Sequence, residues 1–192
     1  MTPAPMRKDA ARNRQRILDV ARRLIGEGTP LQLNDIARLA GVGVATTYRH
    51  FPTPEALMET VATPGLEALI TRAEQALAEE DPWGALTGFL GATLEMQLTD
   101  PSITLVRAAP ERVLPRTEEL TATLDALAGR LLERAQAVGS VQGVVTWDDL
   151  LPLMCGIAYA AGVHADGQEK RLESGCRYLG VMLRGLRSAD PA

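Results

Sequence analysis

The stretch that decides the fold of this 192-residue chain runs from residue 36 to residue 51 and reads Ile-Ala-Arg-Leu-Ala-Gly-Val-Gly-Val-Ala-Thr-Thr-Tyr-Arg-His-Phe. It predicts two short helices, over 33–40 and 43–50, that meet at Gly41. Their tight turn needs a residue that tolerates a positive φ, and glycine does. The second helix is too short and too polar for a core element. A helix of this kind is typical of one that enters the major groove of DNA.

The remainder of the chain is also predicted to be helical. An apolar stripe supports a first helix over 9–27, which ends at Gly28. Hydroxyl or carboxylate caps followed by proline or acids mark the later helix starts. They predict helices over 54–79, 82–98, 101–108, 117–138, 146–164 and 167–187. No stretch alternates convincingly with period two, so the expected fold is all-α with about nine helices.

The net charge of −4 is unevenly distributed along the chain. Residues 1–52 hold nine Lys and Arg against four acids, whereas residues 53–192 hold eleven against twenty. This asymmetry indicates that only the N-terminal part meets a polyanion, although a solvated charged helix face would give the same count. We therefore expect a helix-turn-helix domain over 1–52 and a second domain over 53–192. A non-specific architectural DNA binder would be basic throughout.

Several other classes of protein fit the sequence poorly. The uncharged stretch 150–163 has 14 residues and contains Pro152, whereas a membrane span needs about 20 apolar residues. We therefore expect a cytoplasmic protein with no membrane segment. Cys155 and Cys176 fall in apolar helical patterns and are expected to be reduced core residues.

No enzymatic motif is present in the sequence. The two histidines and two cysteines have no metal-ligand spacing, and there is no phosphate loop, nucleophile motif or dinucleotide fingerprint. We expect no catalytic residue, metal or cofactor.

The segment from about residue 10 to residue 61 closely resembles the DNA-binding domain of TetR-type (tetracycline-repressor-like) transcriptional regulators. The matching residues are Arg16-Ile17-Leu18 with Ala21, Ile36-Ala37, Ala40-Gly41-Val42, Tyr48-Arg49-His50-Phe51 and Glu55-Ala56-Leu57. The resemblance implies a homodimer that binds an inverted-repeat operator in double-stranded DNA and a small-molecule effector that releases it. It also implies that the protein represses transcription, whereas the residues themselves do not distinguish a repressor from an activator.

The resemblance also assigns roles to residues of the helix-turn-helix. Tyr48 and His50 would contact phosphates, and Thr46 a phosphate or a base edge. Arg14 is either a phosphate contact or a solvated charge, and Arg49 meets either a phosphate or a guanine. The full set expected at DNA is Arg14, Gln32, Leu33, Gly43, Val44, Ala45, Thr46, Thr47, Tyr48, Arg49, His50 and Thr53.

Three residues depart from the family pattern. Gln32 stands where Ser or Thr usually caps the second helix, which weakens that cap. Thr47 replaces a buried Leu or Ile, and its hydroxyl is expected to bond back to a carbonyl. Pro54 occupies a site often held by Lys or Arg, so one phosphate contact is expected to be missing.

The last predicted helix carries an apolar seam with spacings of 4, 3, 4 and 3, and apolar residues of the helix before it recur at spacings of 3 and 4. By resemblance these two helices form a four-helix dimer interface; the alternative is that they close the core of one chain. The expected interface residues are Ile157, Ala161, Leu172, Cys176, Leu179, Leu183 and Leu186.

The middle helices are expected to enclose an apolar effector pocket with few polar groups. The candidate lining residues, for which simple core packing is the alternative, are Phe89, Thr93, Met96, Gln97, Met154 and Tyr159. Trp83 and Trp147 are interpreted as packing anchors, and His164 as a helix-end residue.

Overall fold

A computed structural model describes residues 4–163 and 165–187, so that His164 lies outside the described residues. This part of the chain forms nine α-helices and confirms the all-α prediction; one isolated β-bridge pairs Val141 with Arg187. The helices are α1 (Ala4–Gly26), α2 (Leu33–Ala40), α3 (Val44–His50), α4 (Pro54–Leu77), α5 (Pro82–Thr99), α6 (Pro101–Ala108), α7 (Pro115–Ala137), α8 (Trp147–Gly162) and α9 (Gln168–Leu186). Within the described residues, no helix is long and apolar enough to cross a membrane.

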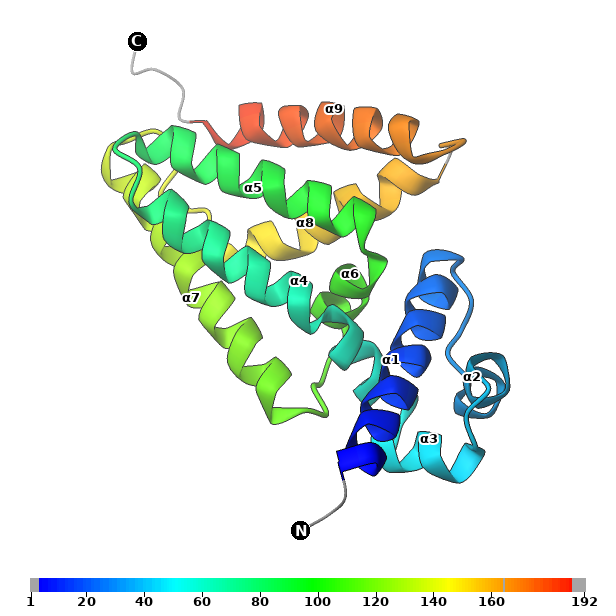
Figure 1. Ribbon diagram of the computed structural model, residues 1–192. Helices are drawn as coiled ribbons and strands as arrows, with labels where there is room; N and C mark the ends of the chain where they lie inside the picture. Colours follow the sequence, from blue (N-terminus) through cyan, green and yellow to red (C-terminus); the bar gives the residue numbers. More distant parts are fainter. Residues whose placement is uncertain (1–3, 164, 188–192) are drawn as a thin grey trace.

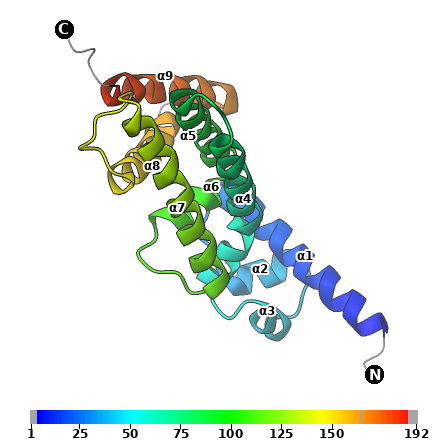
Figure 2. The ribbon, with the colours of Figure 1, turned by 90° about the vertical axis from the view of Figure 1, so that its left-hand side faces the viewer.

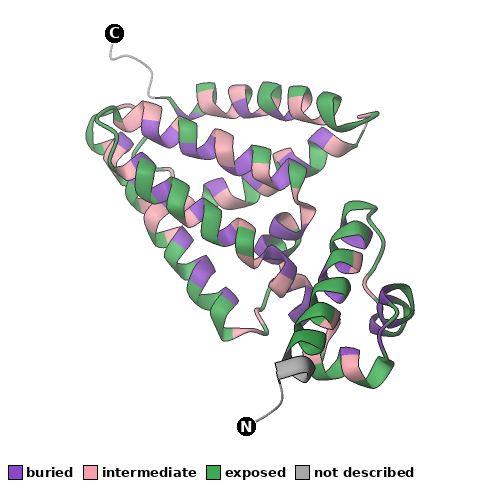
Figure 3. Cartoon of the chain, viewed as in Figure 1, coloured by how far each residue is buried: buried purple, intermediate pink, exposed green. Residues whose placement is uncertain are grey.

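The helices form two packed groups. We call α1–α3 with the first two turns of α4 the head, and the rest of α4 with α5–α9 the body (Figure 1). Turning the molecule by 90° shows that the head is at one end and α9 at the other (Figure 2). In both groups the buried positions follow the inward faces of the helices (Figure 3).

Helix α4 belongs to both hydrophobic cores. Leu57 and Val61 pack in the head cluster, whereas Leu66 and Leu69 pack in the body cluster. Met58, next to Leu57, contacts both clusters. The core of the head therefore extends beyond the expected boundary at residue 52, and a continuous helix connects the two groups.

Four helix starts follow the cap signals in the sequence. Thr53 accepts a hydrogen bond from the Ala56 amide and precedes Pro54 in α4. Asp81 and Asp100 cap α5 and α6 in the same way. Thr146 and Asp149 form a capping box at the start of α8. These local bonds satisfy amides that the first helical turn leaves free.

The start of α7 differs from the prediction. The helix begins at Pro115 instead of Thr117, and Thr117 is fully buried in the first turn. The buried carboxylate of Glu59, on α4, accepts hydrogen bonds from the Val113 and Leu114 amides at 2.7 and 2.9 Å. A side chain more than 50 residues away thus takes the role of a local cap, which no sequence pattern near residue 115 indicates.

Candidate DNA-binding surface and ligand cavity

Helix α3 is anchored by Thr47 and exposes its other side. Thr47 is fully buried, and its hydroxyl donates to the Gly43 carbonyl at 3.3 Å. Thr47 was expected both to be buried with this bond and to contact DNA. The burial and the bond are confirmed, and the expectation of DNA contact is wrong for this reason. Val44, Ala45, Tyr48 and Arg49 are exposed, and Thr46 and His50 are half-buried.

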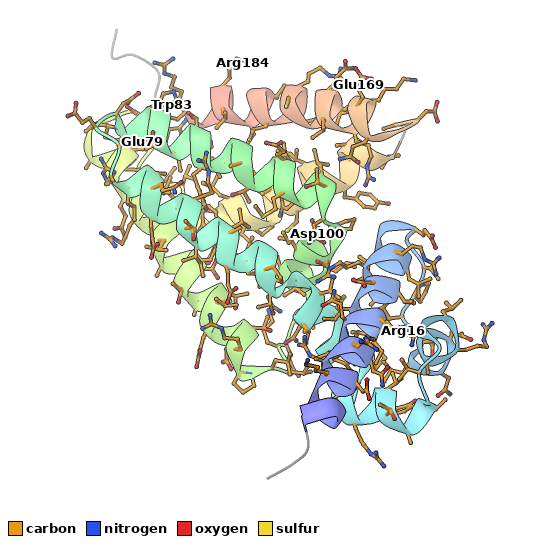
Figure 4. The ribbon with its side chains drawn as sticks, in the orientation of Figure 1. Arg16, Glu79, Trp83, Asp100, Glu169 and Arg184 are labelled. Carbon is orange, nitrogen blue, oxygen red and sulfur yellow. The ribbon has the colours of Figure 1, made fainter. Side chains whose placement is uncertain are left out.

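The turn between α2 and α3 has the geometry that its glycine predicts. Gly41 has φ +62°, and the Val42 amide donates to the Ala37 carbonyl at 2.9 Å. A Cβ on Gly41 would lie only 2.8 Å from Nη2 of Arg16, which reaches from α1 over the turn (Figure 4). Arg16 therefore lies beside the helix-turn-helix, although its role there was not predicted; its match to the family pattern was the available signal.

The start of α2 confirms that its cap is weak and limits how Leu33 can contact DNA. Gln32 makes no side-chain cap bond, as its departure from the family pattern predicts. The side chain of Leu33 is 3% exposed and packs in the head core, so it is unable to contact DNA; only its backbone amide lies at the helix start. Gln32 itself is exposed.

Two further expected DNA contacts have partners within the head. The guanidinium of Arg14 lies 5.5 Å from the centroid of the Phe51 ring, and Phe51 is buried as expected. The hydroxyl of Thr53 accepts the cap bond of α4 and is half-buried. Both side chains are therefore held at the side of the head where α3 ends.

Half of the Lys and Arg side chains that the structure describes in the head are paired with acids on their own helix. Arg12, Arg22, Arg23 and Arg38 each lie within 4 Å of a carboxylate three or four residues away. Among the side chains that the structure describes, the basic residues of the head outside ion pairs are Lys8, Arg14, Arg16 and Arg49. Unpaired cations beside an exposed helix are what a phosphate backbone attracts.

The body contains a small enclosed cavity between α4, α5, α6, α7 and α8. Four of the six candidate residues line it, together with side chains from the other helices; the lining is Leu69, Phe89, Thr93, Gln97, Ile103, Arg107, Leu124, Trp147, Leu151 and Met154. Its free volume of about 10 Å³ is room for one water at most. In this structure the side chains therefore nearly fill the cavity.

Met96 and Tyr159 do not line this cavity, and the expectation is wrong for both. Met96 lies in an open groove with Arg72 and Glu95, on another face of α5. Tyr159 is 77% exposed on α8. Trp147, interpreted as a packing anchor only, is in contrast part of the cavity wall. Helical periodicity locates a face of a helix, but the packing of its neighbours decides what that face contacts.

An ion pair between a buried cation and a half-buried carboxylate, which no sequence pattern indicated, forms one side of the cavity. Both terminal nitrogens of Arg107, on α6, bind the carboxylate of Asp125, on α7, and the Arg107 side chain is 3% exposed. The indole N–H of Trp147 donates to Asp125 Oδ1 at 2.7 Å. The available signal was the position of Arg107 four residues after Ile103, within the buried stripe of α6.

The two cysteines are free thiols in different environments. Cys155 is half-buried near Gln97, and burial raises the pKa of its thiol. Cys176 is exposed on α9, so the expectation that it belongs to the core is wrong. Within the described residues, no group of three or more His, Cys, Asp or Glu is arranged to hold a metal ion.

The seam of α9 packs largely within one chain. Leu179 and Leu186 are buried in the body core with Ala161, and a Cβ on Gly175 would lie 2.7 Å from Leu98 Cδ1 on α5. For these residues the alternative interpretation holds: the seam closes the core of a single chain, because it faces α5. Ile157, Leu172 and Leu183 are half-buried.

The outward face of α8 and α9 exposes a different apolar set. Leu153, Gly156, Ala160 and Val163 recur at spacings of 3, 4 and 3, and all are exposed. On α9, Val181 is 57% exposed. We call this set, with Tyr159, the outer face.

Comparisons with known proteins agree with the geometry of the head. Residues 17–61 match the family described as "Bacterial regulatory proteins, tetR family", and residues 81–188 match "Transcriptional regulator SbtR-like, C-terminal domain". The HTH-type transcriptional regulator SAR0097 of Staphylococcus aureus is 34% identical over 80 residues, 40% of this chain and 42% of that protein. The chain thus spans about two fifths of the length of the curated relatives it matches.

Solved structures resemble the whole chain. The TetR transcription regulatory protein of Mycobacterium vanbaalenii is 31% identical, with 96% of this chain and 100% of that chain covered and a TM-score of 0.52. The TetR transcriptional regulator SCO0520 of Streptomyces coelicolor is 28% identical, with 92% and 99% covered and a TM-score of 0.55. With its exposed α3, the chain belongs to the TetR family of DNA-binding transcriptional regulators.

Proposed function

We propose that this regulator acts in the cytoplasm as a dimeric repressor, without enzymatic activity of its own. Two heads would bind the two halves of an inverted-repeat operator, with α3 of each in the major groove. The observation that carries the proposal is that Thr47 turns inward while Val44, Ala45, Tyr48 and Arg49 face outward. Selecting genomic DNA fragments with the purified protein tests it, and an inverted repeat should be enriched.

Within α3 we propose a division between positioning and base reading. Tyr48 and His50 would bind phosphates, which carry no sequence information, so Tyr48→Phe and His50→Ala should weaken binding to operator and random DNA by similar factors. Val44, Ala45 and Thr46 would face base edges. Changes at Val44 or Thr46 should therefore alter base preference by about 1–3 kcal/mol per contact. A Tyr48→Phe variant with altered base preference and unchanged non-specific binding would contradict the division.

Arg49 has two candidate roles that salt dependence separates. If it binds a phosphate, Arg49→Ala should make the slope of log affinity against log salt shallower by about one unit. If it reads a guanine, one operator position should lose its preference. Affinities measured over a salt series on both DNAs decide between these roles.

We propose that the outer face, instead of the buried seam, forms the dimer interface. Its apolar residues are exposed in the single chain, whereas Leu179 and Leu186 already have partners. Leu153→Glu with Val181→Glu would bury unpaired charge in such an interface. Sedimentation should then give the mass of one chain, 20.6 kDa, instead of about twice that. The control is Val138→Glu, an exposed valine outside the outer face, which should stay dimeric.

Release from the operator would follow binding of a mostly apolar effector in the body cavity. The supporting observation is that α6 contributes Ile103 and Arg107 to the cavity and also packs against α1 and α4. A Cβ on Gly65 of α4 would lie 2.6 Å from Ile103 Cδ1, so a shift of α6 would be transmitted to the helix that carries the head. Fluorescence anisotropy of labelled operator, titrated with candidate apolar molecules, tests the release. A tight effector that is small and highly charged would contradict this idea.

A further inference from the structure

One polar atom in the cavity wall lacks a partner. Gln97, on α5, is 3% exposed, and its Oε1 is buried with no hydrogen bond from any described residue. Its Nε2 has a sulfur contact with Cys155 Sγ at 3.8 Å. A buried carbonyl oxygen without a donor costs free energy, so a molecule that supplies a donor there is bound more tightly.

The remaining cavity polar groups are already engaged. Arg107 is neutralised by Asp125, which also accepts from Trp147, and the Thr93 hydroxyl donates to the Phe89 carbonyl at 2.9 Å. The rest of the wall is apolar and comes from Leu69, Phe89, Ile103, Leu124, Leu151 and Met154. A net charge on the ligand would therefore find no counter-charge that is free to pair with it.

We propose that the effector is an uncharged, largely apolar ring compound that donates one hydrogen bond, from a hydroxyl or N–H group, to Gln97 Oε1. This inference rests on the proposed function of the cavity as the effector site. Because the free volume is about 10 Å³, the ligand enters only as side chains of the wall move aside. Oriented binding follows, since only one end of the ligand meets a polar acceptor.

Three matched probes test the inference on the full-length protein by isothermal titration calorimetry. 1-Naphthol has the donor, naphthalene is the smaller parent ring, and 1-methoxynaphthalene offers only an acceptor. We expect 1-naphthol to bind about tenfold more tightly than either of the others. Equal affinities, a preference for the methyl ether, or no binding of any probe would overturn the inference.

The variant Gln97→Met tests whether the preference for 1-naphthol depends on Gln97 Oε1, because methionine has a similar length and no amide. In this variant the advantage of 1-naphthol should fall to within about twofold. Met96→Leu is the matched control on the same helix, since Met96 does not line the cavity, and it should keep the full preference. If Gln97→Met retains the preference, the assignment to Gln97 is wrong. The comparison of the three probes on the unmodified protein stands even if this variant does not fold.

A parallel anisotropy titration on operator DNA separates this inference from the proposed function. Binding with the donor preference but without operator release contradicts release through this cavity. Operator release by the probes without the donor preference contradicts the hydrogen bond to Gln97 and leaves the release mechanism standing.

Discussion

The ion pairs of the head are local along the chain, whereas the body combines local polar contacts with long-range ones. In the head, the four ion pairs join residues three or four apart, and Thr47 bonds to the carbonyl four residues before it. In the body, Arg107 binds Asp125 across 18 residues, and Glu59, in the second turn of α4, joins the head to the body by binding the amides before α7 across more than 50 residues. A local interaction forms in every protein that has the same short stretch of sequence. A family pattern therefore describes the head residue by residue, whereas the long-range polar contacts of the body, unlike its local caps at Asp81, Asp100 and Thr146, depend on the assembled fold.

The largest effect is expected where a distant partner neutralises a buried charge. Asp125→Asn leaves the guanidinium of Arg107 without its counter-charge, and we expect the free energy of unfolding to fall by about 2–4 kcal/mol. Asp9→Asn, in an exposed local pair of the head, should change it by less than about 1 kcal/mol. Urea denaturation followed by circular dichroism measures both. Equal losses would remove the contrast between the two regions.

Within the head, the turn should be more sensitive than its neighbours. Gly41→Ala forces an alanine to φ +62° and places its methyl group against Arg16, at a cost of about 1–2 kcal/mol and with weaker operator binding. Gly43→Ala is the matched control because Gly43 has φ −61° and the nearest atom to its Cβ would be 3.7 Å away. Thermal unfolding of both variants tests this prediction, which fails if they lose the same stability.

Two adjacent threonines test which face of α3 meets DNA. Thr46→Val should weaken operator binding by about fivefold, since it removes a hydroxyl from the side that we assign to the groove. Thr47→Val removes a hydroxyl bonded to the Gly43 carbonyl and should leave operator affinity within about twofold. Anisotropy measurements on the same operator compare them. A larger effect from Thr47→Val would reverse the proposed orientation.

The smallest expected effect is a difference in reactivity between the two thiols, which involves no change in the stability of the fold. Burial raises the pKa of Cys155, so less of it is thiolate near neutral pH, whereas Cys176 is exposed. With limiting iodoacetamide at pH 7.5, we expect Cys176 to be alkylated before Cys155. Mass spectrometry of the peptides measures the order of alkylation, and the variants Cys155→Ser and Cys176→Ser serve as references. The reverse order would show that Cys155 is the more accessible thiol.

How far the sequence predicts this molecule depends on the range of the interaction. The helix starts at Thr53, Asp81, Asp100 and Thr146 were predicted because each cap bonds within a few residues. The start of α7 was not, because its cap is Glu59.

By itself, the sequence determined the all-α class, the helix-turn-helix and its glycine turn, because periodicity, caps and positive φ are local properties of the chain. Tertiary packing alone decided which faces are free. It placed Leu179 and Leu186 inside one chain, turned Tyr159 outward, and brought Arg107, Asp125 and Trp147 together beside Gln97. A stripe at helical spacing states that a face is apolar; only the neighbouring helices determine whether that face meets its own core, a cavity or solvent.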